Sequence, residues 1–80
     1  MLTLEGFDDC IIGICARYGQ NEIVAYSYGK IIDKLIDDGM SADEAREYFD
    51  YNILGGYLGP NTPCFIEKVP TEYIKDYWNV

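Results

Sequence analysis

The sequence contains no histidine among its 80 residues. Histidine is the commonest general base, the commonest metal ligand and the usual partner of a serine or cysteine nucleophile. Without it, only a lysine or a carboxylate could activate a nucleophile, and the sequence pairs neither of them locally with Cys10, Cys15 or Ser27. We therefore expect no catalytic residues, no enzymatic activity and no cofactor.

Basic residues are also scarce. Six lysines and arginines stand against 14 aspartates and glutamates, which gives a net charge of −8 at pH 7. A charge of this sign and size repels the phosphates of nucleic acids and anionic membrane surfaces. We therefore expect no direct binding to nucleic acid and no binding to membranes.

Long apolar runs are missing as well. The longest one, residues 11–16, contains a glycine and falls far short of the roughly 20 residues needed to span a bilayer. Residues 1–5 have neither the basic start nor the apolar stretch of a secretory signal. These absences predict a protein that stays in the cytoplasm.

Only three cysteines are present, Cys10, Cys15 and Cys64. An odd number does not suit a fully paired disulfide framework, and no CxxC spacing indicates a zinc site or a redox pair. Cys10 and Cys15 lie in apolar surroundings, where a free cysteine behaves as a small buried hydrophobic residue. We expect no structural disulfide and no bound metal.

The composition is otherwise that of a foldable domain, with 49% hydrophobic residues, and the length allows one modest core. Residues 1–80 should therefore form a single compact domain. In an extended chain, residues 9–18 would place apolar side chains on both faces. This pattern predicts a central strand covered at least partly on both sides. The turn-forming residues 19–22 and the β-forming residues 23–26 then complete a hairpin.

From Tyr28 the apolar period changes to that of a helix. The apolar residues of the first predicted helix, 28–38, share one face: Tyr28, Ile31, Ile32, Leu35 and Ile36. Ser27 is the expected N-cap and Gly39 the expected left-handed terminator. Ser41 and Glu44 form a capping box for a second helix that should reach residue 53. Its inward residues should be Ala42, Ala45, Tyr48, Phe49 and Ile53.

A third strand is predicted over residues 64–69, and Thr71 can cap a short final helix. The predicted order is β-β-α-α-β-α. This order gives an α+β domain in which a small antiparallel sheet of about three strands is packed by two central helices and a short C-terminal helix.

Two segments have the composition of ligand-binding loops, residues 33–50 and the glycine-rich residues 55–59. An EF-hand loop with Gly39 at its sixth position would place Lys34 and Ile36 where acids are needed, so that register fails. The glycine-rich segment follows a helix and precedes a proline, whereas phosphate-binding loops leave a strand and open a helix. The end of a helix explains the glycine-rich segment better. Binding of a small ligand at this segment stays open, with less support than protein binding or a structural role.

The strongest feature of the sequence is a concentration of acids on the two central helices. Residues 33–50 contain seven acids and two bases. The acids expected to point away from the core are Asp33, Asp37, Asp38, Asp43, Glu47 and Asp50. Two alternatives remain open: a solvated surface that keeps a small protein soluble, or a surface that meets a basic partner.

Two tyrosines do not fit an apolar face. Tyr51 and Tyr57 flank the predicted end of the second helix, next to the acids. Exposed aromatic side chains beside charged residues are typical anchors of protein interfaces. We therefore include Tyr51 and Tyr57 among the candidate partner-binding residues, against the alternative that they are surface residues without a role.

Several short motifs, taken together, resemble a family of small phage proteins. The matching segments are GFDD at 6–9, IIGI at 11–14, DDGMS at 37–41, EA at 44–45, YF at 48–49, YNI at 51–53, GGY at 55–57 and TP at 62–63. They cover roughly residues 6–66. The resemblance implies a phage accessory protein that acts in the cytoplasm of a host bacterium, and the family brings no catalytic residues to transfer.

The implied phage context raises one functional class above the others. Small acidic phage proteins without enzymatic activity often bind host proteins, and anti-CRISPR and other anti-defence inhibitors belong to this class. We therefore expect binding to a host protein such as a defence nuclease or effector complex. The competing hypothesis is a non-catalytic structural or regulatory phage module, which could act as a homodimer.

Overall fold

The chain folds as a three-stranded sheet with two helices packed against one face. The computed structural model describes residues 1–56 and 59–75. Its elements, in chain order, are η1 (Asp8–Cys10), β1 (Ile11–Cys15), β2 (Ile23–Ser27), α1 (Tyr28–Asp37), α2 (Ala42–Tyr48), η2 (Phe49–Leu54), β3 (Cys64–Ile66) and α3 (Thr71–Lys75). The predicted α+β class and the order β-β-α-α-β-α are confirmed.

The sheet is mixed, and its strand order is β1-β2-β3. β1 pairs antiparallel with β2, as predicted, whereas β3 pairs parallel with β2, with Ala25 opposite Cys64 and Tyr26 opposite Phe65. The prediction of a purely antiparallel sheet was therefore wrong in this detail. A parallel pair requires a long crossover, and α1, α2 and η2 supply it.

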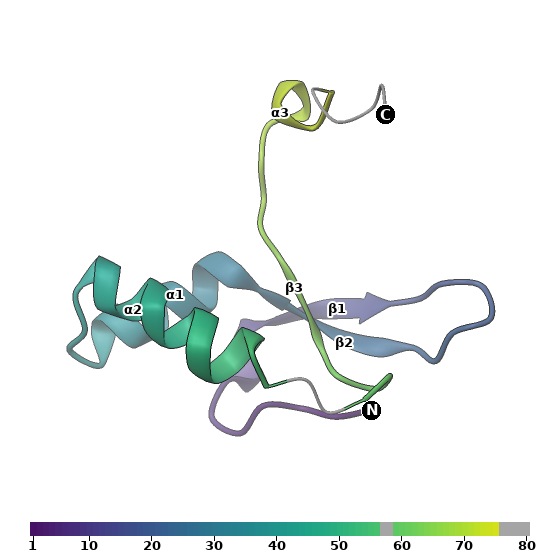
Figure 1. Cartoon of the computed structure of the whole chain (residues 1–80), viewed down its shortest axis with the longest axis horizontal. Helices are drawn as coiled ribbons and strands as arrows, with labels where there is room; N and C mark the ends of the chain where they lie inside the picture. Colours follow the sequence, from purple (N-terminus) through teal and green to yellow (C-terminus); the bar gives the residue numbers. More distant parts are fainter. Residues whose placement is uncertain (57–58, 76–80) are drawn as a thin grey trace.

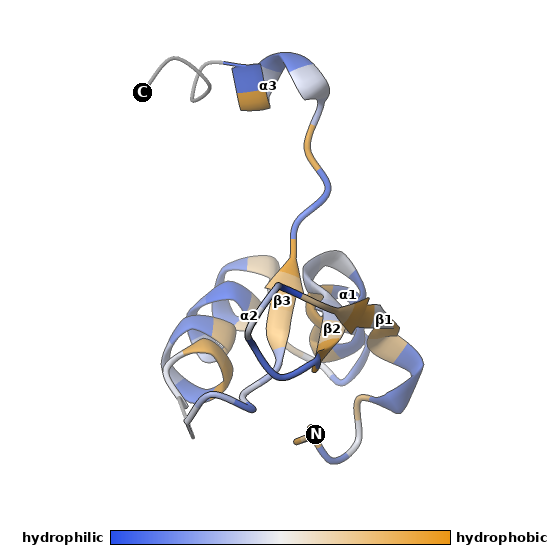
Figure 2. Ribbon diagram, turned by 90° about the vertical axis from the view of Figure 1, so that its right-hand side faces the viewer, coloured by the Kyte–Doolittle hydropathy of each residue, from blue (hydrophilic) through white to orange (hydrophobic). Residues whose placement is uncertain are grey.

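The prediction that the first strand is central was also wrong. β1 lies at the edge of the sheet, and the side chains of Ile12 and Ile14 are 47% and 55% exposed. Figure 2 shows β1 as a hydrophobic strand at the margin, with β2 between it and β3. The parallel docking of β3 gives β2 the central position, which the alternation within residues 9–18 could not reveal.

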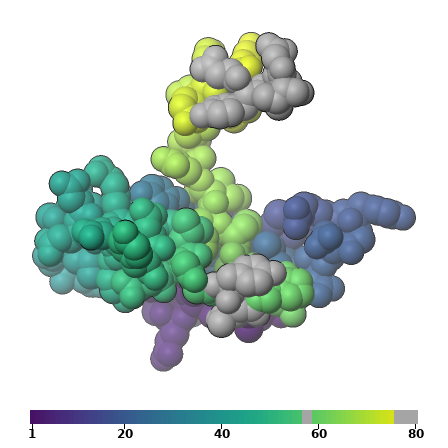
Figure 3. All heavy atoms as spheres, viewed as in Figure 1, coloured from purple at the N-terminus to yellow at the C-terminus, as the bar shows by residue number. Residues whose placement is uncertain are grey.

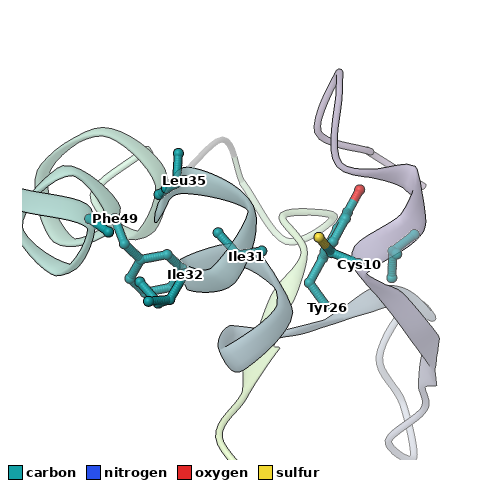
Figure 4. Close-up of a cluster of buried hydrophobic side chains, with 8 residues drawn as sticks. Cys10, Tyr26, Ile31, Ile32, Leu35 and Phe49 are labelled. Atoms are coloured by element: carbon teal, nitrogen blue, oxygen red, sulfur yellow. The ribbon is translucent and has the colours of Figure 1, made fainter. Parts of the chain in front are cut away.

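The core lies between one face of the sheet and the two helices. Its buried side chains are Cys10, Val24, Tyr26, Ile31, Ile32, Leu35, Ala45 and Phe49. Figure 4 shows Ile31 between two groups, with Phe49 and Ile32 on the helical side and Tyr26 and Cys10 on the side of the sheet. The apolar stripe of α1 therefore fastens the second helix to β2.

The helix boundaries follow from local capping. The Ser27 hydroxyl accepts a hydrogen bond from the Lys30 N–H at 3.2 Å, and Gly39 has a φ of +113° just beyond α1. At α2, the Ser41 hydroxyl accepts from the Glu44 N–H at 3.1 Å, and the Glu44 carboxylate accepts from the Ser41 N–H at 3.0 Å. The predicted caps and the capping box are confirmed.

The second helix changes its winding at Phe49. Residues Phe49–Leu54 form a π-helix, which ends with the Gly55 N–H donating to the Asp50 carbonyl at 3.1 Å. Ala45 and Phe49 are buried and Ile53 is half-buried, as expected, but Ala42 and Tyr48 are exposed. The predicted inward face was therefore wrong at Ala42, the first residue of α2, and at Tyr48, both of which precede the π-turn.

The C-terminal helix stands away from the rest of the molecule. Figures 1 and 2 both show α3 at the end of an extended segment that continues from β3. Its Tyr73 and Ile74 side chains are exposed, and none of its described residues is buried. The short helix predicted after Thr71 is present, and its further predicted residues Tyr77 and Trp78 lie outside the described ones.

The hydroxyl of Tyr26 provides a direct test of the fold. It accepts a hydrogen bond from the Leu4 N–H at 2.7 Å and so holds the N-terminal segment on the core. Tyr26→Phe should lower the free energy of unfolding by about 1 kcal/mol, because the Leu4 N–H loses its acceptor. Urea unfolding should show this loss, while Tyr18→Phe, at a fully exposed side chain, should cost nothing measurable. Equal stabilities of the two variants would contradict it.

The capping box of α2 gives a second test. Ser41→Ala should lower the free energy of unfolding by about 1 kcal/mol, the usual cost of a lost N-cap. The hydrogen bonds from Ser41 lower the pKa of Glu44 below its ordinary value of 4.5. The stability that the Glu44 carboxylate contributes is therefore present above its unfolded-state pKa. It is lost as the pH falls through the pKa of Glu44 in the folded state.

Denaturant melts of wild type and Ser41→Ala at neutral pH measure the cost of the lost cap. Repeating them for wild type and Glu44→Gln across the acid range isolates the carboxylate. A cost for Ser41→Ala of only a few tenths of a kcal/mol would mean that the cap does not stabilise α2.

Candidate functional site

The structure divides the predicted acidic residues between two surfaces. Asp33, Asp37 and Asp38 lie on α1 and at its end, while the second group lies on α2 and η2. This second group consists of Asp43, Glu47, Asp50 and Tyr51, and we call it the α2–η2 surface. All these residues are exposed. Tyr57, the remaining candidate, lies outside the described residues.

The acids of α1 line a shallow cleft that also contains lysines. The cleft has a volume of about 390 Å³ and is lined by Asp9, Cys10, Lys30, Asp33, Lys34, Asp37 and Asp38. The ammonium group of Lys34 contacts both carboxylate oxygens of Asp9, at 3.1 and 3.2 Å. Because two lysines stand among the acids, this cleft has mixed charge and does not extend the acidic surface uniformly.

The ion pair in this cleft was not predicted, because 25 residues separate Asp9 from Lys34. The hydrogen bond from Lys34 lowers the pKa of Asp9, and the same contact raises the pKa of Lys34. Both groups thus stay charged over the neutral range. The pair connects η1 to α1, and its exposed position makes it a weak contributor to stability.

The cysteine at the base of this cleft is shielded. Cys10 is buried in the core, and burial together with the neighbouring Asp9 charge raises the pKa of its thiol. A thiol is a nucleophile only when ionised, so both effects make Cys10 unreactive. Cys15 and Cys64 also carry free thiols, and burial and the nearby Cys15 raise the pKa of Cys64.

The α2–η2 surface carries three acids, and Arg46 is the one base on these two elements. Arg46 contacts Asp43 at 3.1 Å, a fully solvated pair one turn apart. Glu47 and Asp50 have no ion-pair partner within residues 1–56 and 59–75. Tyr51 projects beside them with 78% of its surface exposed. Figure 3 shows the green atoms of α2 and η2 next to the yellow-green segment that contains β3.

A pocket opens between η2 and β3, at the margin of the α2–η2 surface. It has a volume of about 280 Å³ and is lined by Tyr28, Phe49, Asp50, Leu54, Phe65 and Glu67. We call it the aromatic pocket. Tyr28 and Phe65 each meet the ring of Phe49 edge-on, with centroid distances of 4.9 and 5.0 Å. The pocket therefore combines an aromatic base with two carboxylates.

Phe65 and Glu67 were not predicted as functional candidates. Both lie within the predicted strand 64–69, of which β3 forms only Cys64–Ile66, and only the parallel pairing of β3 with β2 brings them beside η2. Asp50 was predicted, but its position at a pocket was not. The π-turn that begins at Phe49 is the local irregularity at this place, and such turns are frequent at functional sites.

Metal-ligand clusters and membrane-spanning helices are absent from the described residues. Within residues 1–56 and 59–75, no group of three or more cysteines and carboxylates is arranged to hold a metal ion. None of the helices in this part of the chain combines the length and the apolarity needed to cross a bilayer.

Comparison of the chain with protein-family models, with curated proteins and with solved structures found no match.

Proposed function

We propose that this chain is a small acidic phage protein that acts in the cytoplasm of its host by binding a basic host protein, as an anti-defence inhibitor of the anti-CRISPR type. The partner class is a nucleic-acid-binding protein such as a defence nuclease or effector complex. Such a protein must present a positive groove to hold phosphates, and an acidic surface can occupy that groove.

The observation that carries the proposal is the α2–η2 surface. Glu47 and Asp50 have no ion-pair partner among the described residues, and the exposed ring of Tyr51 lies between them and the end of the helix. Unpaired acids raise the rate of encounter with a basic partner, and an exposed aromatic ring supplies buried contact area once the partner has docked. The combination suits a protein interface better than a surface that serves only solubility.

Reversal of charge on this surface tests the proposal. The variant with Asp43, Glu47 and Asp50 all changed to lysine should lose its inhibition of host defence and its binding to the purified effector. Because these side chains face water, its stability should change little. The association rate constant should fall by about tenfold or more, with a weaker dependence on salt.

The matched control changes Glu5, Glu22 and Glu72 to lysine. These three acids are exposed, lie outside the α2–η2 surface and produce the same change in net charge. Glu67 is unsuitable as a control because it lines the aromatic pocket. Phage-infection assays and binding kinetics compare the two variants, and equal activity of both would mean that the acidic surface serves only solubility.

A second candidate function, a structural module that acts as a homodimer, is favoured by the edge strand β1. Its residues Ile11–Cys15 carry no charge, and all three of its isoleucines are at least 36% exposed. An edge of this kind pairs readily with another strand, and two copies related by a two-fold axis could join their sheets there.

Light scattering coupled to size exclusion decides between monomer and dimer. If the chain pairs through β1, wild type should elute as a dimer and Ile14→Lys as a monomer. The control Ile74→Lys, at a similarly exposed isoleucine of α3, should remain dimeric. A monomeric wild type would exclude this second candidate.

A further inference from the structure

We propose that the aromatic pocket binds the side chain of an arginine presented by a protein partner. The inference rests on the proposed function and deepens it, since it assigns one chemical group of a basic partner to one place on this chain. The pocket adjoins the α2–η2 surface and shares Asp50 with it.

The base of the pocket is suited to a flat cation. Phe49 is only 3% exposed, and the half-buried rings of Tyr28 and Phe65 meet it at interplanar angles of 83° and 87°. The rings thus hold one another in edge-to-face contacts, so that the pocket is formed before a ligand arrives. A guanidinium group is planar, weakly hydrated and stacks on aromatic rings.

The two carboxylates supply the complementary charge. Asp50 comes from η2 and Glu67 from the segment after β3, and neither forms an ion pair within residues 1–56 and 59–75. A carboxylate can accept two parallel hydrogen bonds from a guanidinium. Because the pocket wall is apolar, charge pairing there is stronger than on an open surface.

Other occupants fit these groups less well. An apolar side chain would cover Asp50 and Glu67 without offering either of them a donor, and a buried unpaired carboxylate is costly. A metal ion would find two carboxylates and no third ligand among the described residues. Lysine offers the charge but lacks the planar, forked donor arrangement of arginine.

The experiment uses the full chain and small blocked amino acids. Nitrogen-15 NMR spectra are recorded while N-acetyl-arginine methylamide is added, with the lysine and norleucine analogues as parallel probes. The arginine probe should produce saturable shifts at the amides of Tyr28, Asp50 and Phe65 with millimolar affinity. The lysine probe should bind more weakly, and norleucine should not bind.

Two double variants distinguish the effect of the pocket carboxylates from the effect of net charge. Asp50→Asn with Glu67→Gln preserves size and should reduce the affinity for the arginine probe by about tenfold, the effect of losing a charge-assisted contact of about 1.4 kcal/mol. The control, Asp43→Asn with Glu47→Gln, removes the same charge outside the pocket and should bind like wild type. All four side chains are exposed, so folding should be preserved.

The proposal would be overturned if the arginine probe caused no shifts at the pocket, or if norleucine caused equal ones. Tighter binding of the lysine probe, or an equal loss of affinity for arginine in both double variants, would also overturn it. The titration needs no partner protein, so its outcome does not depend on whether the α2–η2 surface binds a host protein. Conversely, Asp43→Lys with Glu47→Lys tests that surface without changing any residue of the pocket.

Discussion

The burial of Tyr26 is the constraint on which the rest of the structure depends. It lies on the central strand with no exposed surface, and its hydroxyl holds the backbone of Leu4. Its ring packs against Phe65 at 6.0 Å, Phe65 packs against Phe49, and Phe49 packs against Tyr28. This row of aromatic rings connects the N-terminal segment, the sheet and both helices, and in a chain with so small a core few other contacts can do so.

The same row of rings explains why carboxylates and aromatic side chains lie together at the aromatic pocket. The rings emerge from the core at Tyr28 and Phe65, where η2 contributes Asp50. On α1, by contrast, lysines alternate with the acids, and Lys34 is engaged by Asp9. A net charge of −8 is therefore distributed unevenly, and the end of the second helix combines unpaired acids with exposed aromatic side chains.

The features that the sequence predicts correctly are those set by neighbours along the chain. Ser27, Ser41, Glu44 and Gly39 act within one helical turn, so their pattern determines the ends of α1 and α2 without knowledge of the tertiary structure. The strand order depends on which segments meet after a crossover, and no local pattern encodes that choice. The apolar alternation of residues 9–18 consequently predicted a central strand where an edge strand lies.

The candidate site shows the same division. Exposure of the acidic residues follows from helical periodicity and is confirmed for all six acids and for Tyr51. The ion pair of Asp9 with Lys34 joins residues 25 positions apart, and the aromatic pocket is lined by Asp50 and Glu67, which are 17 positions apart. The π-turn at Phe49 also escaped prediction, because its sequence continues an ordinary apolar stripe.

The parallel pairing of β3 has a consequence for how binding and folding are linked. Ala25 and Cys64 are opposite one another, so this pairing closes a long loop and carries its entropic cost. The aromatic pocket takes Tyr28 and Phe49 from within that loop, Phe65 from the strand that closes it, and Glu67 from the segment just after that strand. Any ligand of the pocket therefore binds only the closed loop, and by mass action it holds β3 on the sheet.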